Sequence, residues 1–230
     1  MNKNVNKRKQ ALQKLKPLSA DQVFAEVPTL REPRVLGDWV LWLEQRPNEG
    51  GRTTALIRPW GSSQVHEQEL TPAPMDLRSR VHSYGGGALA SLGEGDELLL
   101  AWVDDKEGCL WTQSWQGFSK PKQENGIFLT SIHSPRCLSC NVDLLADGLI
   151  DPLRKRWLGV MEKDGKDFLV SFSLSQKYQN PTIIYQPKDF AGYLSLSPKG
   201  DQLAWVEWQH PSMPWEASQL LIGSFNNSGE

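Results

Sequence analysis

Four side chains that could bind or activate a substrate alternate along one short stretch of the sequence. They are Arg78, Arg80, His82 and Tyr84, and the three consecutive glycines 85–87 follow them directly. In an extended backbone, residues at this period of two lie on one face. Glycines at the end of such a segment indicate a sharp turn or a close approach of another segment. The alternation itself favours a strand that ends in a bend, and the alternative is a polar strip that faces a cavity.

A second unusual stretch lies at 203–216, close to the C-terminus. Residues 203–208 are typical of a strand that is partly buried on both faces, whereas the next segment contains Pro211 and Pro214. A proline cannot donate a ladder hydrogen bond, so the chain must leave the sheet there. His210 and Trp215 flank this departure, and we interpret His210 as a side chain that stabilises a turn rather than as a base.

No independent catalytic site is predicted. His82 with a serine and an acidic residue could imitate a catalytic triad, but a triad is defined by geometry, and the sequence contains no G-x-S-x-G nucleophile motif. Gly85 to Ala90 fits G-x-G-x-x-A on paper, but Gly93 and Gly95 would break the helix that a dinucleotide site requires. We therefore expect no catalytic residue and no cofactor.

Three cysteines raise the question of a metal or redox site. His133, Cys137 and Cys140 have H-x3-C-x2-C spacing, and Cys109 is the next cysteine along the chain. Zinc would require a fourth ligand and usually a second close pair, so we expect no metal. The odd number does not indicate a disulfide framework, and no βαβ pattern supports a redox pair. The sequence predicts buried thiols or thiols in loops.

The composition is typical of a folded soluble protein. The 230 residues have a formal charge of −2, 23% charged residues and ten tryptophans. This balance gives no reason to expect nucleic-acid binding, and no apolar run is long enough for a membrane span. The basic N-terminus lacks the apolar segment of a secretory signal, so the expected location is the cytoplasm. The tryptophans fall mostly in predicted strands, which favours core packing over an aromatic binding surface.

Residues 1–17 contain six basic residues and no acidic one. A nucleic-acid or anionic-membrane arm is one interpretation, but a solvated, flexible terminus is favoured. A short helix is expected to follow, because Ser19 and Gln22 have capping-box spacing, and Leu18 and Val23 have the spacing of a hydrophobic staple.

The rest of the chain, 18–230, is predicted to be an all-β domain. Strand-turn-strand units recur near 35–60, 88–115, 157–174 and 192–225. Spacings of about 35 to 55 residues, with about four strands per unit, are typical of β-propeller blades, whereas a sandwich gives less reason for so long a period. We expect a partial propeller of about four blades, with the last one incomplete. Its open edges would favour self-association.

Several motifs resemble the propeller of serine peptidases of the prolyl-oligopeptidase family, in the branch called acylaminoacyl-peptidase or dipeptidyl aminopeptidase. The resemblance covers roughly 18–225 and rests on Arg80-Val-His-Ser-Tyr-Gly-Gly-Gly87, Ser197-Pro-Lys-Gly200 before Leu203-Ala-Trp205, His210-Pro-Ser-Met-Pro-Trp215, and Asp151-Pro152 before Trp157 to Glu162. The sequence departs from the family pattern at Ser83, where Glu is usual, so the interaction made by that acidic side chain is not expected here.

The resemblance implies a seven-bladed propeller followed by an α/β-hydrolase domain that carries out the proteolysis. This chain would lack that domain, as a fragment, the product of an interrupted gene or one part of a split enzyme. The missing domain would then belong to the same polypeptide (in cis) or to a separate one (in trans). By analogy, the propeller restricts access to short peptides, and Arg78, Arg80, His82, Tyr84, His210 and Trp215 are candidates for gating or lining its pore. The alternative is a free-standing binding or scaffold module without hydrolase activity.

Overall fold

The computed structural model describes residues 17, 19–20, 27–61, 66–119, 128–140, 143–226 and 229. The predicted basic arm and most of the short helix expected around Leu18 to Val23 lie outside the described residues. Within the described part, the chain is all-β, as predicted, and no helix is long and apolar enough to cross a membrane.

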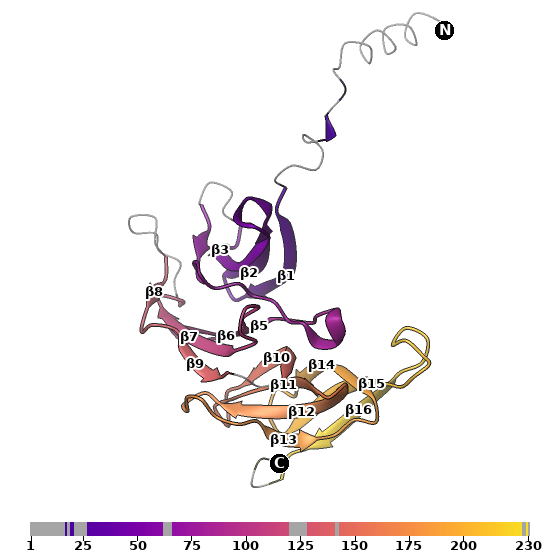
Figure 1. Cartoon of the computed structure of the whole chain (residues 1–230). Coiled ribbons are helices and arrows are strands. Elements are labelled where there is room, and N and C mark those ends of the chain that lie inside the picture. The colour runs from indigo at the N-terminus through magenta and orange to yellow at the C-terminus, as the bar shows by residue number, and fades with distance from the viewer. Residues whose placement is uncertain are drawn as a thin grey trace, which may run out of the picture.

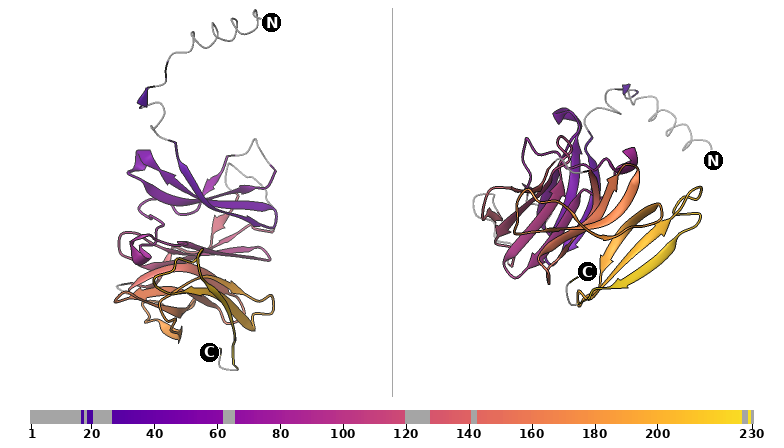
Figure 2. Two further views of the ribbon diagram at one scale, coloured as in Figure 1. Left: turned by 90° about the vertical axis from the view of Figure 1, so that its right-hand side faces the viewer. Right: turned by 60° about the horizontal axis from the view of Figure 1, so that its bottom comes forward.

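Four antiparallel sheets follow one another along the chain and stack face to face, which confirms the partial propeller (Figure 1, Figure 2). The first sheet contains β1 (Thr29–Leu36), β2 (Trp39–Arg46), β3 (Arg52–Pro59) and β4 (Gln68–Glu69). The second contains β5 (Leu89–Glu94), β6 (Glu97–Val103), β7 (Leu110–Gln116) and β8 (Thr130–Ser131), with β9 (Arg136–Ser139) also paired to β7. The third contains β10 (Leu144–Asp151), β11 (Arg156–Lys163), β12 (Lys166–Ser173) and β13 (Thr182–Tyr185).

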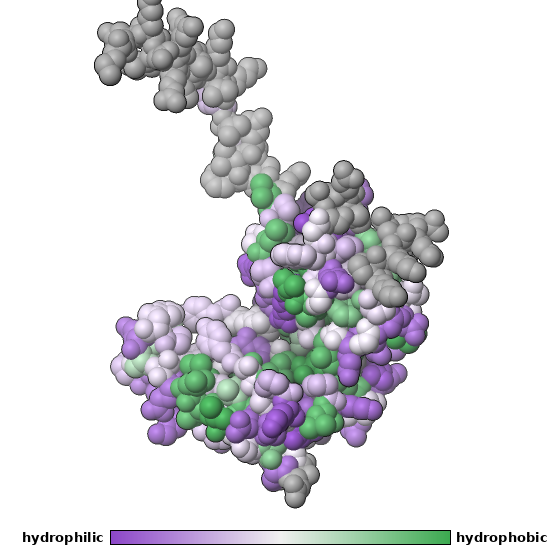
Figure 3. All heavy atoms as spheres, turned by 180° about the vertical axis from the view of Figure 1, so that it is seen from behind, coloured by the Kyte–Doolittle hydropathy of each residue, from purple (hydrophilic) through white to green (hydrophobic). Residues whose placement is uncertain are grey.

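The fourth sheet has three strands, β14 (Phe190–Leu196), β15 (Gln202–Trp208) and β16 (Gln219–Ser224). The predicted incomplete last blade is thus confirmed. On its strand β16, Leu220 and Ile222 are 68% and 64% exposed. Figure 3 shows the whole molecule from behind, and patches of hydrophobic residues lie on the lower part of the surface seen in that view.

The central sheets are apolar on both faces because each lies between two others. Along β6, Leu98, Leu100 and Trp102 belong to a core shared with the first sheet, and the alternate residues Ala101 and Val103 belong to a core shared with the third. A third core lies between the third and fourth sheets. An alternating strand sends its side chains to opposite faces, so a strand packed on both sides must be apolar at nearly every position.

The first strands of three sheets are interrupted by a bulge, and in two of them the bulge points a side chain toward the second sheet. In β1, β10 and β14 the register shifts around Glu32, Asp147 and Tyr193, whose φ angles are positive, between 48° and 58°. The Glu32 carboxylate accepts the Ala88 N–H at 3.1 Å, and the Asp147 carboxylate accepts the Gly87 N–H at 2.6 Å. The bulges therefore hold the start of β5 from both sides.

The packing between sheets leads to a first prediction. Leu100→Ala should lower the free energy of unfolding by about 2–5 kcal/mol, because it leaves a cavity at a fully buried position between two sheets. Leu220→Ala changes the same residue type at an exposed position and should cost less than about 0.5 kcal/mol. Urea unfolding of both variants measures the difference, and equal losses would contradict the description of a two-faced core.

Candidate functional site

The two unusual stretches of the sequence meet in one cavity of about 770 Å³. One wall is formed by the 81–86 segment, the opposite wall by the 208–215 segment, and further residues come from the third and fourth sheets. Four of the six predicted site residues line it: His82, Tyr84, His210 and Trp215. The first two lie at least 126 positions before the last two in the sequence, so only the fold brings them together.

The segment that carries His82 is a tight turn. Val81–Ser83 form a short 3-10 helix, η2, in which His82 and Ser83 have positive φ angles of 50° and 63°. A Cβ on Gly85 would lie 2.8 Å from the Ser79 carbonyl oxygen, so this position requires glycine. The strand that the alternation favours is therefore not formed over 78–84, and the four side chains do not share one face.

The His82 side chain is fixed by two carboxylates of the third sheet. Its Nε2 lies 2.7 Å from Asp167 Oδ1 at the start of β12, and its Nδ1 lies 3.6 Å from Glu162 Oε2 at the end of β11. The backbone N–H of His82 also donates a hydrogen bond to the Glu162 carboxylate. These contacts set both the ring and the backbone of His82.

Asp167 is the centre of this network. It is 1% exposed, and its second oxygen accepts the Ala191 N–H of β14 at 2.9 Å. Burial raises the pKa of Asp167, and the hydrogen bonds from Ala191 and His82 partly oppose that rise. One carboxylate thus joins η2, the third sheet and the fourth sheet.

Aromatic rings continue the wall from His82 toward the C-terminal segment. Phe190 packs edge-on against His82 at 4.9 Å and against His210 at 5.1 Å, and stacks on Trp208 at 5.7 Å between centroids. The backbone N–H of His210 donates to Asp189 Oδ2 at 3.1 Å.

The proline-containing segment leaves the sheet as predicted, between the end of β15 at Trp208 and the start of β16 at Gln219. Its turn is closed by Glu216, whose carboxylate accepts the Met213 N–H at 2.8 Å. Trp215 is 76% exposed and Tyr84 is 95% exposed, one on each wall. The cavity therefore has polar groups at the half-buried His82 and the buried Asp167, and exposed aromatic side chains on both walls.

The glycines beside His82 allow the third sheet to come close. A Cβ on Gly86 would lie 2.7 Å from the Ala146 side chain, and one on Gly87 would lie 3.1 Å from Asp147 Oδ1. In return, the Asp147 N–H donates to the Gly87 carbonyl at 2.8 Å. Asp147 also lines the cavity and adds a second carboxylate to it.

Two predicted residues, Arg78 and Arg80, lie away from this cavity. Nε and Nη2 of Arg80 donate to the two carboxylate oxygens of Asp105, at 2.7 and 2.8 Å. The Arg78 N–H donates to the Val103 carbonyl at 3.1 Å. Both arginines line a different cavity of about 510 Å³ with the 103–108 turn. Sequence reasoning missed Asp167 and Phe190 as site residues, because each is a single residue at the start of a strand with no motif around it.

The three cysteines come together, but not as expected. Cys109 and Cys140 form a disulfide, which corrects the prediction of free thiols, and Cys137 is a free, buried thiol. His133 is not part of the cluster, since its Nδ1 contacts the Ser134 carbonyl at 2.8 Å. Burial raises the pKa of the Cys137 thiol. Cys109 and Cys140 are bonded to each other, so neither has a thiolate that could bind a metal ion.

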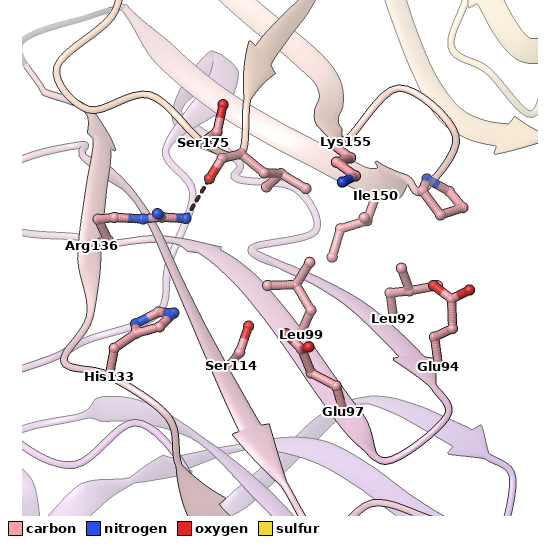
Figure 4. A pocket seen from close by; sticks show the side chains of 12 residues that line it. Leu92, Glu94, Glu97, Leu99, Ser114, His133, Arg136, Ile150, Lys155 and Ser175 are labelled. Carbon is pink, nitrogen blue, oxygen red and sulfur yellow. Dashed lines mark hydrogen bonds between the residues drawn. The ribbon is translucent and has the colours of Figure 1, made fainter.

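A second cavity, of about 540 Å³, lies between the second and third sheets (Figure 4). Arg136, His133 and Ser175 line one side of it, and Glu94 and Glu97 the other. Arg136 donates to the Leu174 carbonyl, the interaction drawn in the figure. Pro152 and His133 line this cavity, but no residue of the 78–87 or 203–216 stretches does, so the first cavity is the better candidate site.

Comparison with solved structures finds proteins that share this fold. A puromycin-hydrolysing peptidase of Mycobacterium tuberculosis is similar over 93% of this chain, with 25% identity and a TM-score of 0.72. A puromycin hydrolase is similar over 94%, with 24% identity and a TM-score of 0.73. TolB from Acinetobacter baumannii, at 12% identity and a TM-score of 0.50 over 87% of the chain, shares the fold alone. Searches of family models and of curated proteins give no match.

This chain spans 33% of the length of either peptidase. The resemblance to the propeller portion of prolyl-oligopeptidase-family peptidases is thereby confirmed.

The buried carboxylate leads to a second prediction. Because the pKa of Asp167 is raised, the folded chain holds this proton to a higher pH than the unfolded chain, whose aspartate titrates near 3.8. As pH rises above that value, the wild type should lose free energy of unfolding relative to Asp167→Asn, until the pH passes the raised pKa. Urea unfolding of both chains between about pH 4 and pH 7 measures the difference.

Asp164→Asn is the matched control, because it removes one negative charge from an exposed aspartate three positions earlier. Its difference from the wild type should stay nearly constant over the same range. If the advantage of Asp167→Asn shrank with rising pH, His82 would be holding the carboxylate ionised and the assignment of a raised pKa would be wrong.

Proposed function

We propose that this propeller portion of a prolyl-oligopeptidase-family peptidase gates substrate access for a catalytic domain and is not catalytic by itself. The hydrolysis would be carried out by an α/β-hydrolase domain, in cis or in trans. The structural relatives support this, because they are peptidases three times as long as the part that matches this chain. The lack of G-x-S-x-G in the sequence supports it as well.

The observation that carries the proposal is the convergence of the two motif segments on one cavity. The His82 turn and the 210–215 loop lie far apart in sequence, yet they form opposite walls of it. The Asp167 carboxylate, the bonds around Gly87 and the Phe190 ring hold the His82 wall in place. Loops positioned by a rigid scaffold are where proteins usually place recognition residues.

The lining predicts the class of ligand. Phe190, Trp208 and Trp215 offer aromatic faces, and Asp147 offers a carboxylate close to them. Aromatic faces bind apolar side chains and attract cations, and carboxylates bind ammonium groups. A short peptide with a free amino terminus and an apolar or aromatic first residue satisfies both features. Dipeptidyl aminopeptidase activity is the corresponding class for the whole enzyme, whereas an acylaminoacyl-peptidase substrate, whose amino terminus is blocked, would use the aromatic faces alone.

The alternative is a free-standing binding or scaffold module without hydrolase activity. It uses the same cavity but needs no catalytic partner. The two functions differ in whether a polypeptide with a G-x-S-x-G motif accompanies this chain in its source cells.

A third prediction follows. The purified chain should release no chromophore from aminoacyl or acyl-aminoacyl p-nitroanilides above the rate in buffer, because it supplies no activated serine. Native purification from the source cells, followed by mass spectrometry, should find the chain joined to, or associated with, a G-x-S-x-G hydrolase domain. Hydrolysis by the chain alone would contradict both functions, and the absence of such a domain would favour the scaffold.

A fourth prediction concerns the cavity itself. Trp215→Ala should weaken the binding of the dipeptide Phe-Ala about tenfold, which corresponds to about 1.4 kcal/mol for the loss of one aromatic contact. Trp60→Ala is the matched control, since Trp60 is a similarly exposed tryptophan directly after β3, outside the cavity. Isothermal titration calorimetry measures both variants. Equal affinities would show that the peptide does not occupy this cavity.

A further inference from the structure

Three cysteine sulfurs lie together where β9 pairs with the start of β7. The Sγ atoms of Cys109, Cys137 and Cys140 are all within 4.8 Å of one another. Cys109 and Cys140 are joined, and the Sγ of the free Cys137 is 2.8 Å from that of Cys140. A disulfide needs two sulfurs, so the third sulfur in contact with it requires its own explanation.

The arrangement matches the geometry of thiol–disulfide exchange, in which a thiolate attacks one sulfur of a disulfide. We propose that the three cysteines form a thiol–disulfide exchange site, in which the disulfide moves between Cys109–Cys140 and Cys137–Cys140. Cys137 is the attacking thiol, Cys140 is the sulfur common to both bonds, and Cys109 is the leaving group.

The step balances without an external oxidant or reductant. The Cys137 thiol loses its proton and its thiolate attacks Cys140 Sγ. The Cys137–Cys140 bond forms as the Cys109–Cys140 bond breaks, and the released Cys109 thiolate takes up a proton. Glu107 Oε2 lies 3.5 Å from Cys109 Sγ, and its negative charge favours the protonated form of the released sulfur. One thiol and one disulfide are present before and after the step.

The two positions of the disulfide differ in what they tie together. Cys109–Cys140 links positions 31 residues apart, and it anchors the end of the 104–108 turn to the residue that follows β9. Cys137–Cys140 closes only a local C-x-x-C loop and releases Cys109. The same turn holds Arg80 through Asp105, and Arg80 directly precedes the turn that carries His82. The exchange therefore removes the covalent anchor from the end of the turn that holds Arg80.

Differential alkylation of the wild-type chain tests the site. The chain is reduced, reoxidised with glutathione disulfide, incubated at a series of pH values, quenched with acid and labelled with N-ethylmaleimide under denaturing conditions. Peptide mapping then identifies the free cysteine. We expect two disulfide isomers, with Cys109 free in one and Cys137 free in the other. Burial raises the pKa of Cys137, and Glu107 adds to that rise. The two isomers should therefore interconvert about tenfold faster for each unit by which the pH is increased, up to that pKa.

Two variants separate exchange from a static disulfide. Cys137→Ser should keep Cys109–Cys140 as its single disulfide at every pH. Cys109→Ser should form Cys137–Cys140, and hydrogen exchange at the 104–108 amides should be faster in it than in Cys137→Ser. Thermal unfolding confirms that each variant is folded. The proposal is overturned if Cys109 is never free while Cys140 is oxidised in the wild type, or if folded Cys109→Ser forms no disulfide with glutathione disulfide.

Discussion

The candidate site depends on one buried carboxylate. Asp167 accepts a hydrogen bond from the His82 ring and another from the Ala191 backbone, so it joins three segments that are separate in sequence. A carboxylate that is 1% exposed is expensive to bury unless it is fully bonded. This cost makes the arrangement specific, because displacement of any one of the three segments leaves a buried polar group without a partner. This carboxylate therefore holds the aromatic wall that starts at His82 and Phe190 in position.

The packing of the sheets imposes a second constraint. Strands such as β6 contribute to cores on both faces, so their side chains are fixed from two directions. The connecting segments take their positions from these rigid sheets. This explains how the His82 turn can keep two non-glycine residues at positive φ angles, since the bonds to Glu162 and Asp167 compensate for the unfavourable backbone.

Sequence patterns predicted the fold well and the site in part. The recurring strands and turns were sufficient for the class, the propeller and its incomplete last sheet, because apolar alternation is a local property. The two motif segments were singled out for their composition, yet that composition does not show that they meet. The strand favoured by the alternation of Arg78, Arg80, His82 and Tyr84 was wrong, because the left-handed residues of the turn depend on tertiary bonds to Glu162 and Asp167. The Cys109–Cys140 disulfide could not be deduced, since three cysteines allow several pairings and only the fold selects one.

The bulge carboxylates described in the fold have a consequence for how such a chain can diversify. Glu32 in the first sheet and Asp147 in the third both reach the start of β5, whereas the equivalent position in the fourth sheet is the exposed Tyr193. The blades are therefore not interchangeable modules. A duplicated or transplanted blade would bring the wrong side chain to its neighbour. The pairs of residues that connect the blades therefore determine the order of the blades.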